Sequence, residues 1–443
     1  MTGKSGIAML FGSTPTTMCH SVSYAHPGKE FPGYDGTCPA RKTFLNPLTV
    51  AVMLLTALLC SPGTLRGAVH AGNQDIRQGL AKGNNDFALS LFRQLDRSGE
   101  NLFFSPYSIS SAMGMVFEGS RANTSAEVQN VMHFRFGREQ LAEAFWNCNH
   151  DLMSRASASG QKLNIANALV LTGDTPGKPY TDRVRKYYDA EIFPGGLDKI
   201  NAWVADKTMG RIPSILQQLD SNSMFVLLNA IWFKSSWESA FRRESTSDMP
   251  FSVSPKKQVT VKMMYQKHDF SMVEEKELKA IGLPYRGGEL SMVIFLPRAK
   301  DGLARFEKSL TPQRLSDLLS RLDSQSAEEI ELSFPKFTMT AGYDLVRPFR
   351  KMGMSEAFGE KADFTGMGFR PGEVWIGQIR HKAFVEVNEE GTEAAGATAV
   401  EFVTKALPYS KEFKADHPFL FLIRDNRQGT ILFMGRVCDP TSR

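Results

Sequence analysis

One short stretch near the C-terminal end constrains the fold most, because it suits an exposed loop and a sheet strand equally well. Between Gly391 and Val400 almost every residue is Ala, Gly or Thr. Read with a period of two, one face is small and uncharged, whereas Glu393 and Glu401 lie on the other. Such a segment can enter a sheet with its glutamates in solvent. Composition alone favours an Ala-rich helix or a flexible linker, so the pattern leaves these structures open.

Hydrophobic periodicity in the rest of the chain predicts one mixed α+β domain. The 443 residues are 42% hydrophobic and 22% charged, which is a globular composition. Residues 72–443 contain no repeat and no low-complexity linker, so we expect a single domain there. Helices are expected around residues 87–95 and 140–152, and strands at 224–233, 291–296, 330–339, 419–423 and 430–433. The polar residues 425–429 predict a hairpin between the last two strands.

An apolar run at residues 48–59, preceded by Arg41 and Lys42, is typical of a secretory signal. It is shorter than the roughly 20 residues that a permanent anchor needs. We therefore expect residues 1–71 to be an extension with a recessed signal cleaved near Ala71, and the protein to be secreted. An uncleaved anchor or a start site placed too early are the alternatives. Cys148 and Cys438 would remain after cleavage; free thiols are expected, although the spacing leaves pairing open.

Motifs of catalysis are missing from the sequence. It contains no G-x-S-x-G, H-E-x-x-H, Walker or G-x-G-x-x-G motif, and its eight histidines are dispersed. We expect no enzyme activity, no metal and no cofactor. The net charge of +5 comes from Lys and Arg mixed with nearly as many Asp and Glu, so nucleic acid is not an expected partner.

Residues 388–408 resemble the hinge and reactive-centre loop of serpins, and residues 413–423 (F-K-A-D-H-P-F-L-F-L-I) match that family's C-terminal signature. Further similar segments follow in the family's order: 101–109, 163–171, 200–210, 227–238, 283–297 and 362–367. The resemblance covers the chain from about residue 80 to its end. It implies the serpin fold, an α+β structure with about nine helices, three β-sheets and an exposed reactive-centre loop.

The sequence departs from the family at residues 118–124, where E-G-S-R-A-N-T stands in place of L-G-A-(K/R)-G-N-T. Asn123 in this segment starts the chain's N-x-S/T sequon. The same asparagine is the family's usual residue at a helix start. Helix capping and glycosylation therefore remain alternatives for Asn123.

The resemblance also implies a suicide-substrate inhibitor, whose loop is cleaved by a protease and then inserts into the main sheet. Counting fourteen residues from Gly391 makes Lys405 the residue presented to the protease and Ala406 the residue after the cleaved bond. Phe402, Val403 and Thr404 would fill the adjoining subsites. A lysine suits the acidic pocket of trypsin-like proteases. In a shifted register, Leu407 or Phe402 would point to chymotrypsin-like proteases instead.

Other matched positions are implied to control insertion. The hinge comprises Glu389, Gly391, Thr392, Ala394, Ala395, Gly396, Ala397 and Thr398. Glu389 is expected to pair with Lys336 above Trp237, where a lost partner would leave an uncompensated charge. Ser105, Ser108, Asn229 and His381 would form a hydrogen-bonded cluster at the centre of the sheet. His381 alone is equally explained as a histidine that satisfies a backbone group.

The small hinge residues favour an inhibitor over a non-inhibitory serpin that acts as a carrier, chaperone or store. The expected partners are trypsin-like serine proteases, held in a covalent complex by a monomeric inhibitor. Residues 140–154 carry no Lys or Arg, so glycosaminoglycan assistance is not expected.

Overall fold

The structure, a computed structural model, describes residues 62–95, 99–219, 225–392 and 411–442. The chain divides into two units, Met1–Thr64 and Leu65–Arg443, and the fold given below is that of the second. The apolar run at 48–59 and residues 393–408 of the predicted loop lie outside the described residues.

Nine α-helices occur in the described part of the chain, as the resemblance implied. They are α2 (Pro62–Leu95), α3 (Pro106–Gly119), α4 (Ala122–Val131), α5 (Arg138–Ala158), α6 (Lys178–Tyr188), α7 (Leu197–Lys207), α8 (Leu303–Ser309), α9 (Pro312–Ser324) and α10 (Val346–Met352). Local sequence explains α9 well, since the Thr311 hydroxyl caps it by accepting from the Arg314 amide and Pro312 occupies its first turn.

The strands form two hydrogen-bonded sheets. They are β1 (Leu102–Phe104), β2 (Lys162–Leu171), β3 (Glu191–Pro194), β4 (Phe225–Ser236), β5 (Ser247–Ser254), β6 (Lys257–Glu274), β7 (Leu278–Pro284), β8 (Leu290–Pro297), β9 (Glu328–Pro335), β10 (Phe337–Asp344), β11 (Ile376–Asn388), β12 (Gly391–Thr392), β13 (Lys411–Lys414), β14 (Phe419–Asp425) and β15 (Thr430–Val437). A six-stranded sheet has the order β10-β11-β12-β4-β2-β3, and a nine-stranded sheet runs β1-β15-β14-β8-β7-β6-β9-β13 with β5 on β6. Two of the three expected sheets are joined because the long strand β6 pairs with β5 and β9 through its first part and with β7 through its last residues.

The predicted C-terminal hairpin is confirmed, with Asp425 paired to Thr430 at its turn. The single strand predicted at residues 330–339 is wrong. Its first half is the end of β9 in the nine-stranded sheet, and its second half begins β10 in the six-stranded sheet. The chain changes sheet at Pro335 and Lys336, where proline has no amide proton to give to a ladder.

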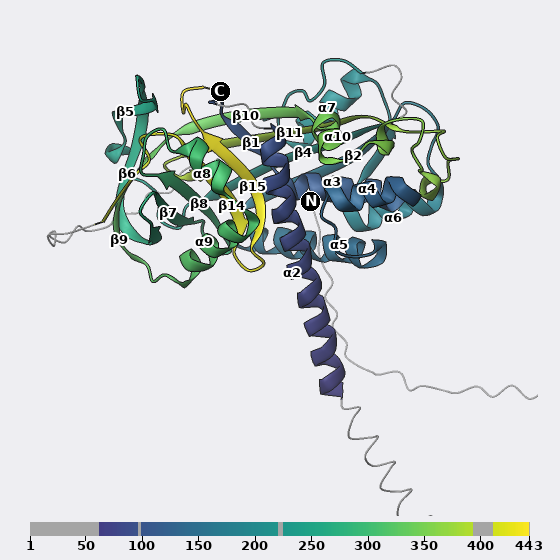
Figure 1. Ribbon diagram of the computed structural model, residues 1–443, viewed down its shortest axis with the longest axis horizontal. Coiled ribbons are helices and arrows are strands. Elements are labelled where there is room, and N and C mark those ends of the chain that lie inside the picture. The colour runs from purple at the N-terminus through teal and green to yellow at the C-terminus, as the bar shows by residue number, and fades with distance from the viewer. Residues whose placement is uncertain (1–61, 96–98, 220–224, 393–410, 443) are drawn as a thin grey trace, which may run out of the picture. The chain divides into compact units, whose positions relative to one another are not determined.

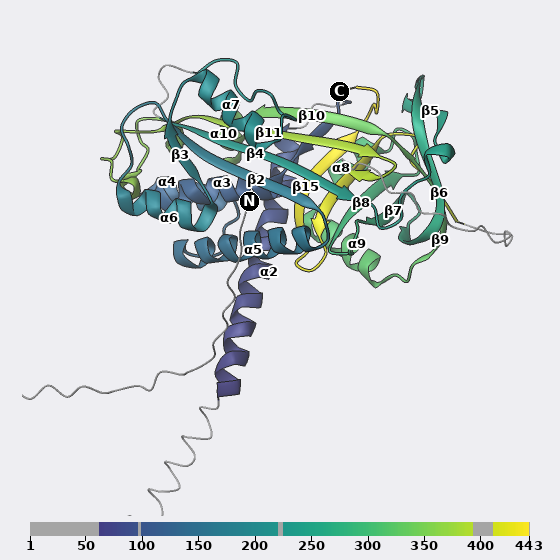
Figure 2. The same cartoon turned by 180° about the vertical axis from the view of Figure 1, so that it is seen from behind.

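The six-stranded sheet is covered on both faces (Figures 1 and 2), with α7 on one face and α3 on the other. Val204 of α7 packs with Ala230 and Trp232 of β4. On the opposite face, residues of α3 join Leu227 and Ile231 of β4 in the main core. Both faces of β4 are therefore buried, which explains its almost continuous apolar sequence.

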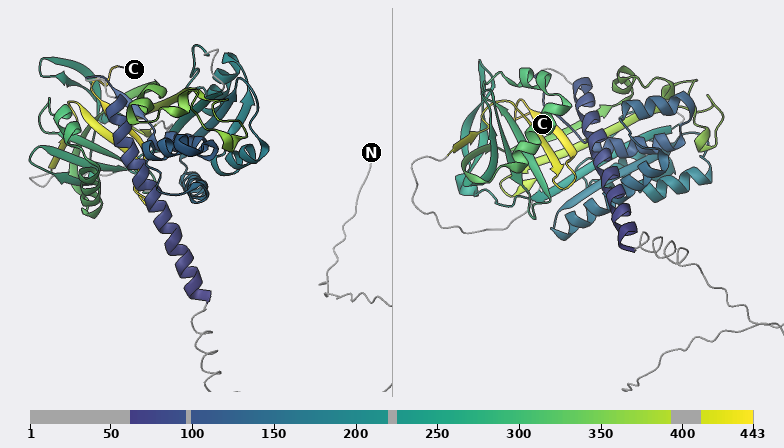
Figure 3. Two further views of the ribbon diagram at one scale, coloured as in Figure 1. Left: turned by 45° about the vertical axis from the view of Figure 1, so that its right-hand side comes forward. Right: turned by 60° about the horizontal axis from the view of Figure 1, so that its bottom comes forward.

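Helix α2 runs beside β15 (Figure 3), and the Asn84 amide donates to the Ile431 carbonyl at 2.9 Å. Its backbone is helical from Pro62, so the predicted cleavage site near Ala71 falls inside a helix. None of the helices described is both long enough and apolar enough to cross a membrane.

Candidate functional site

A two-residue strand, β12, lies at one end of the boundary between β11 and β4. The chain leaves β11 at Asn388, turns through Glu389 and Glu390, and returns as Gly391 and Thr392. Thr392 pairs with Val387 of β11 on one side and with Ser235 of β4 on the other, antiparallel to both. Farther along, β11 and β4 pair directly and in parallel. The chain segment that leads into the predicted loop thus already occupies the start of a strand position in the six-stranded sheet.

Gly391 is required at this turn. Its φ is +150°, and a Cβ built on it would lie 2.0 Å from the Ser235 carbonyl oxygen. The Asn388 side chain closes the turn by accepting a hydrogen bond from the Glu390 amide at 3.0 Å. A larger residue at 391 would force β12 away from β4.

Thr392 points into the core, as the period-two pattern predicted. The residue is 1% exposed, and its hydroxyl lies 2.7 Å from the hydroxyl of Tyr285. The Tyr285 ring stacks on Trp237 with 4.8 Å between centroids. Trp237 in turn donates its indole N–H to the Asn388 carbonyl at 3.0 Å. The stacked rings of Tyr285 and Trp237 therefore hold the hinge in place, each through one hydrogen bond.

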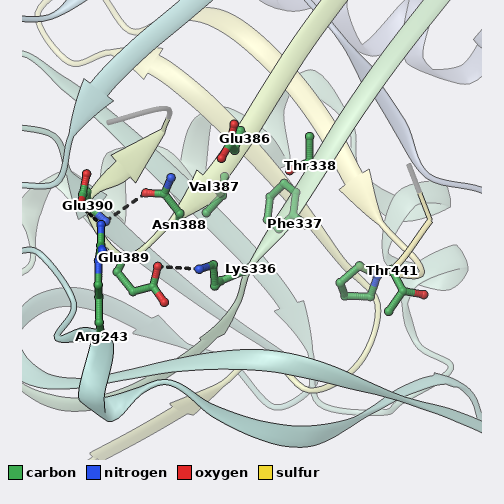
Figure 4. Close-up of a pocket in the computed structure, with 11 residues that line it drawn as sticks. Arg243, Lys336, Phe337, Thr338, Glu386, Val387, Asn388, Glu389, Glu390 and Thr441 are labelled. Carbon is green, nitrogen blue, oxygen red and sulfur yellow. Dashed lines mark hydrogen bonds and ion pairs between the residues drawn. The ribbon is translucent and has the colours of Figure 1, made fainter. Parts of the chain in front are cut away.

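Glu389 and Lys336 face one another beside the turn (Figure 4), with 2.7 Å between Oε2 and Nζ. The Thr246 hydroxyl donates to the other carboxylate oxygen at 2.8 Å. Burial alone would raise the pKa of Glu389, but the hydrogen bonds from Lys336 and Thr246 hold it below its ordinary value. A cavity of about 550 Å³ opens next to this pair and is lined by Arg243 and Glu390 as well.

A buried hydrogen-bond network crosses the boundary between β11 and β4, and it contains the four residues that the resemblance grouped. Nδ1 of His381 lies 2.6 Å from Asn229 Oδ1, and the Ser105 amide donates to its Nε2 at 3.1 Å. The Asn229 amide donates to the Ser108 hydroxyl and to the Ser108 carbonyl. Ser105 also caps α3 by accepting from the Ser108 amide. The network therefore ties α3 to both strands.

His381 is neutral in this network. Burial lowers its pKa to about 3, so the imidazole carries one proton at neutral pH. Nε2 accepts from a backbone amide, which leaves that proton on Nδ1, directed at Asn229. The group is suited to holding two strands together and not to proton transfer.

Sequence reasoning missed three contributors to the site. Asn167 of β2 accepts from the Asn229 amide at 2.8 Å and donates to Ser111, which extends the network to a third strand. Tyr285 and Thr246 contact the hinge from distant parts of the chain. The only sign of them in the local sequence was Asn167, a polar residue within the apolar run of β2.

Several predicted residues lie outside the described part or away from the site. Ala394, Ala395, Gly396, Ala397, Thr398, Phe402, Val403, Thr404, Lys405 and Ala406 all lie outside the described residues. Asn123 does not cap α4, since Arg121 precedes the helix and Asn123 is an exposed residue of its first turn that donates to Glu127. Cys148 and Cys438 are buried thiols that form no disulfide with each other. Within the described ranges, no group of three or more His, Cys, Asp or Glu side chains could hold a metal ion.

Residues 82–440 match the family model described as "Serpin (serine protease inhibitor)". The chain is 40% identical to leukocyte elastase inhibitor of Sus scrofa over 380 residues, and 35% identical to Serpin B4 of Homo sapiens over 391 residues. Each match covers 82% of this chain and 99% of the relative. The native structure of the thermophilic serpin tengpin superposes with a TM-score of 0.74 at 27% identity, covering 81% of this chain and 94% of tengpin.

These comparisons overturn the prediction of secretion. The relatives are matched over nearly their whole length, yet the family model begins at residue 82, so they contain no counterpart of the apolar run at 48–59. Helix α2 also continues through the predicted cleavage site. The signal peptide and the extracellular location are therefore withdrawn.

Proposed function

The chain belongs to the serpin family of serine protease inhibitors, and on that premise we propose that it traps trypsin-like proteases through Lys405. The missing enzyme motifs left the activity undefined, and the family match replaces that expectation with a positive one: an inhibitor that uses the catalytic reaction of its target. The inhibitory domain is proposed to comprise residues 72–443.

In the proposed reaction, the serine oxygen of the protease attacks the carbonyl carbon of Lys405. The bond to Ala406 breaks, the new amine of Ala406 leaves with a proton, and Lys405 becomes an ester on the protease. The freed segment then extends β12 along the boundary between β11 and β4, and the attached protease is distorted before water can hydrolyse the ester. Insertion separates the His381–Asn229 contact, which is why the network controls opening.

The position of β12 is the observation that carries this proposal. Gly391 and Thr392 already pair with both strands between which insertion must occur. The loop begins at this point, and Lys405 is the only Lys or Arg among residues 388–410. A cationic side chain at the cleaved bond is the chemistry that an acidic specificity pocket selects.

An elastase- or chymotrypsin-like target is the second candidate, because the relatives with 37–40% identity are named leukocyte elastase inhibitors. A chymotrypsin-like protease, whose pocket accepts a large apolar side chain, would use Phe402 or Leu407 in a shifted register. Incubation with trypsin, chymotrypsin and elastase, followed by denaturing gels and N-terminal sequencing of the released fragment, tests both. A covalent complex with trypsin and a fragment that begins at Ala406 are expected. A fragment that begins at Val403 or Pro408, with a complex only for the other enzymes, would replace Lys405 by Phe402 or Leu407.

A further inference from the structure

A second cavity, of about 710 Å³, lies where residues 214–219, which follow α7, cross the ends of β10 and β11. Its lining from β11 consists of Gln378, Arg380 and Lys382, which alternate with Ile379 and His381 along the strand. Because successive side chains of a strand point to opposite faces, these three lie on the α7 side of the sheet and the His381 network lies on the α3 side. The cavity is thus separate from the site described above, and its volume is typical of small-molecule sites.

The cavity contains a buried acceptor with no partner. Gln378 is 7% exposed, and in the described part of the chain its Oε1 makes no hydrogen bond. The pairing of β11 with β4 is irregular next to this residue, since its register shifts between Ile376 and Gln378. An unpaired buried acceptor lowers stability, so its retention here calls for a donor that the described residues do not supply.

The charges that line the cavity are mainly positive. Nε of Arg380 is also buried without a partner among the described residues, while its terminal nitrogen pairs with Asp344 at 3.2 Å. The ammonium group of Lys382 donates to the Ser214 carbonyl at 2.7 Å, and burial lowers its pKa. An ammonium group has three protons to donate, and among the described residues of the lining Asp344 is the only carboxylate. The described lining therefore keeps one net positive charge to attract an anion.

We propose that this cavity binds a small oxyanion that carries a hydroxyl group, either a hydroxycarboxylate or a phosphate monoester. The anionic oxygens accept from Nε of Arg380 and from Lys382, and the ligand hydroxyl donates to Oε1 of Gln378. One such molecule therefore gives a hydrogen-bond partner to both Oε1 of Gln378 and Nε of Arg380. This binding does not depend on the proposed protease target.

Isothermal calorimetry with matched ligand pairs tests the proposal on the full chain at constant ionic strength. The pairs are malate with succinate, and glycerol 3-phosphate with propyl phosphate; each pair differs in its hydroxyl groups. The hydroxylated member of at least one pair should bind about fivefold to tenfold more tightly than its partner, since it alone satisfies Gln378. Which pair binds identifies carboxylate or phosphate as the anion. Equal affinities within both pairs, or no heat at millimolar concentration from any compound, would overturn the proposal.

Three variants locate the site. Arg380→Met should abolish binding, whereas Lys276→Met, which removes an exposed positive charge elsewhere, should leave it unchanged. Gln378→Leu should make paired ligands bind equally and, without ligand, should raise the thermal midpoint because an unsatisfied buried acceptor is gone. Binding that survives Arg380→Met in full, or a ligand preference that survives Gln378→Leu, contradicts the assignment.

Discussion

The imidazole of His381 and the carboxamide of Asn229 are joined by a contact of 2.6 Å, and the two residues are direct partners in the parallel pairing of β11 and β4. Extension of β12 along this boundary requires them to separate. Asn229 also contacts Ser108 of α3 and Asn167 of β2, so the opening of the sheet breaks contacts with a helix and a third strand as well. Fully satisfied buried networks of this kind are rigid, which is the property a barrier to opening needs.

Replacement of Lys405 by Ala should abolish inhibition of trypsin. The substitution removes the charge that the protease pocket selects, while a loop position contributes little to packing. We expect the association rate constant with trypsin to fall by at least about a hundredfold, a difference of about 3 kcal/mol. Lys411→Ala, which removes the first lysine after the loop, is the control and should inhibit normally. An unchanged rate for Lys405→Ala would show that another residue is presented.

Thr392→Arg should convert the inhibitor into a substrate. The threonine is 1% exposed against Tyr285, and an unpaired guanidinium there costs about 3 kcal/mol or more, so the variant should hold β12 out of the sheet and would have to bury the charge for the loop to insert. Cleavage at Lys405 precedes insertion, so the variant should still be cut. Denaturing gels should detect cleaved inhibitor without a covalent complex, and many molecules should be consumed per protease. Thr392→Val keeps the shape without a charge and should form the complex; if Thr392→Arg forms it equally well, insertion at this point is not needed.

Acid should destabilise the protein through His381. Burial lowers the folded-state pKa to about 3, whereas the unfolded chain titrates near its ordinary value of about 6.5. The unfolded state therefore binds a proton that the folded state does not, and stability falls as the pH drops below about 6.5. Between pH 7 and pH 5, wild type should lose about 2 kcal/mol more unfolding free energy than His381→Gln. Urea unfolding at both pH values, followed by tryptophan fluorescence, measures this; equal losses would mean that the folded protein accepts the proton.

The ion pair between Lys336 and Glu389 predicts that substitutions of its two members have non-additive effects on the free energy of unfolding. Lys336→Met leaves the Glu389 carboxylate, with its side chain 8% exposed, without its cation. We expect a loss of about 1–2 kcal/mol, below the value for a fully buried pair because the lysine side chain is 37% exposed. Adding Glu389→Gln should recover part of the loss. Lys262→Met, which breaks an exposed pair with Asp248, is the control and should change stability by less than about 0.5 kcal/mol. Additive effects of Lys336→Met and Glu389→Gln would argue against coupling.

Much of the fold follows from local sequence, because its signals are local. The hairpin at 419–437 has aromatic and β-branched residues on both sides of a polar turn, and it forms as predicted. The change of sheet at Pro335 was missed, since both flanking segments read as strand and only tertiary packing separates them. At the site, Glu389 and Lys336 were paired through the family resemblance, whereas Tyr285 was not found, because it meets Thr392 across 107 residues of sequence. Contacts between such distant residues depend on how the whole core assembles, and they produce no periodic pattern in the sequence.

The turn at Glu389 and Glu390 has a kinetic consequence. A strand that adds to a sheet normally pays for loop closure before its first hydrogen bonds form. Here β12 already forms a hairpin with β11. Each residue added to β12 therefore extends an existing ladder of hydrogen bonds, and no new loop has to be closed. The alignment is fixed as well, since a slip by one residue would turn Thr392 outward and bring a Cβ against the Ser235 carbonyl where only Gly391 fits. The rate of insertion is then governed by how fast β4 and β11 separate, and not by a search for the right register.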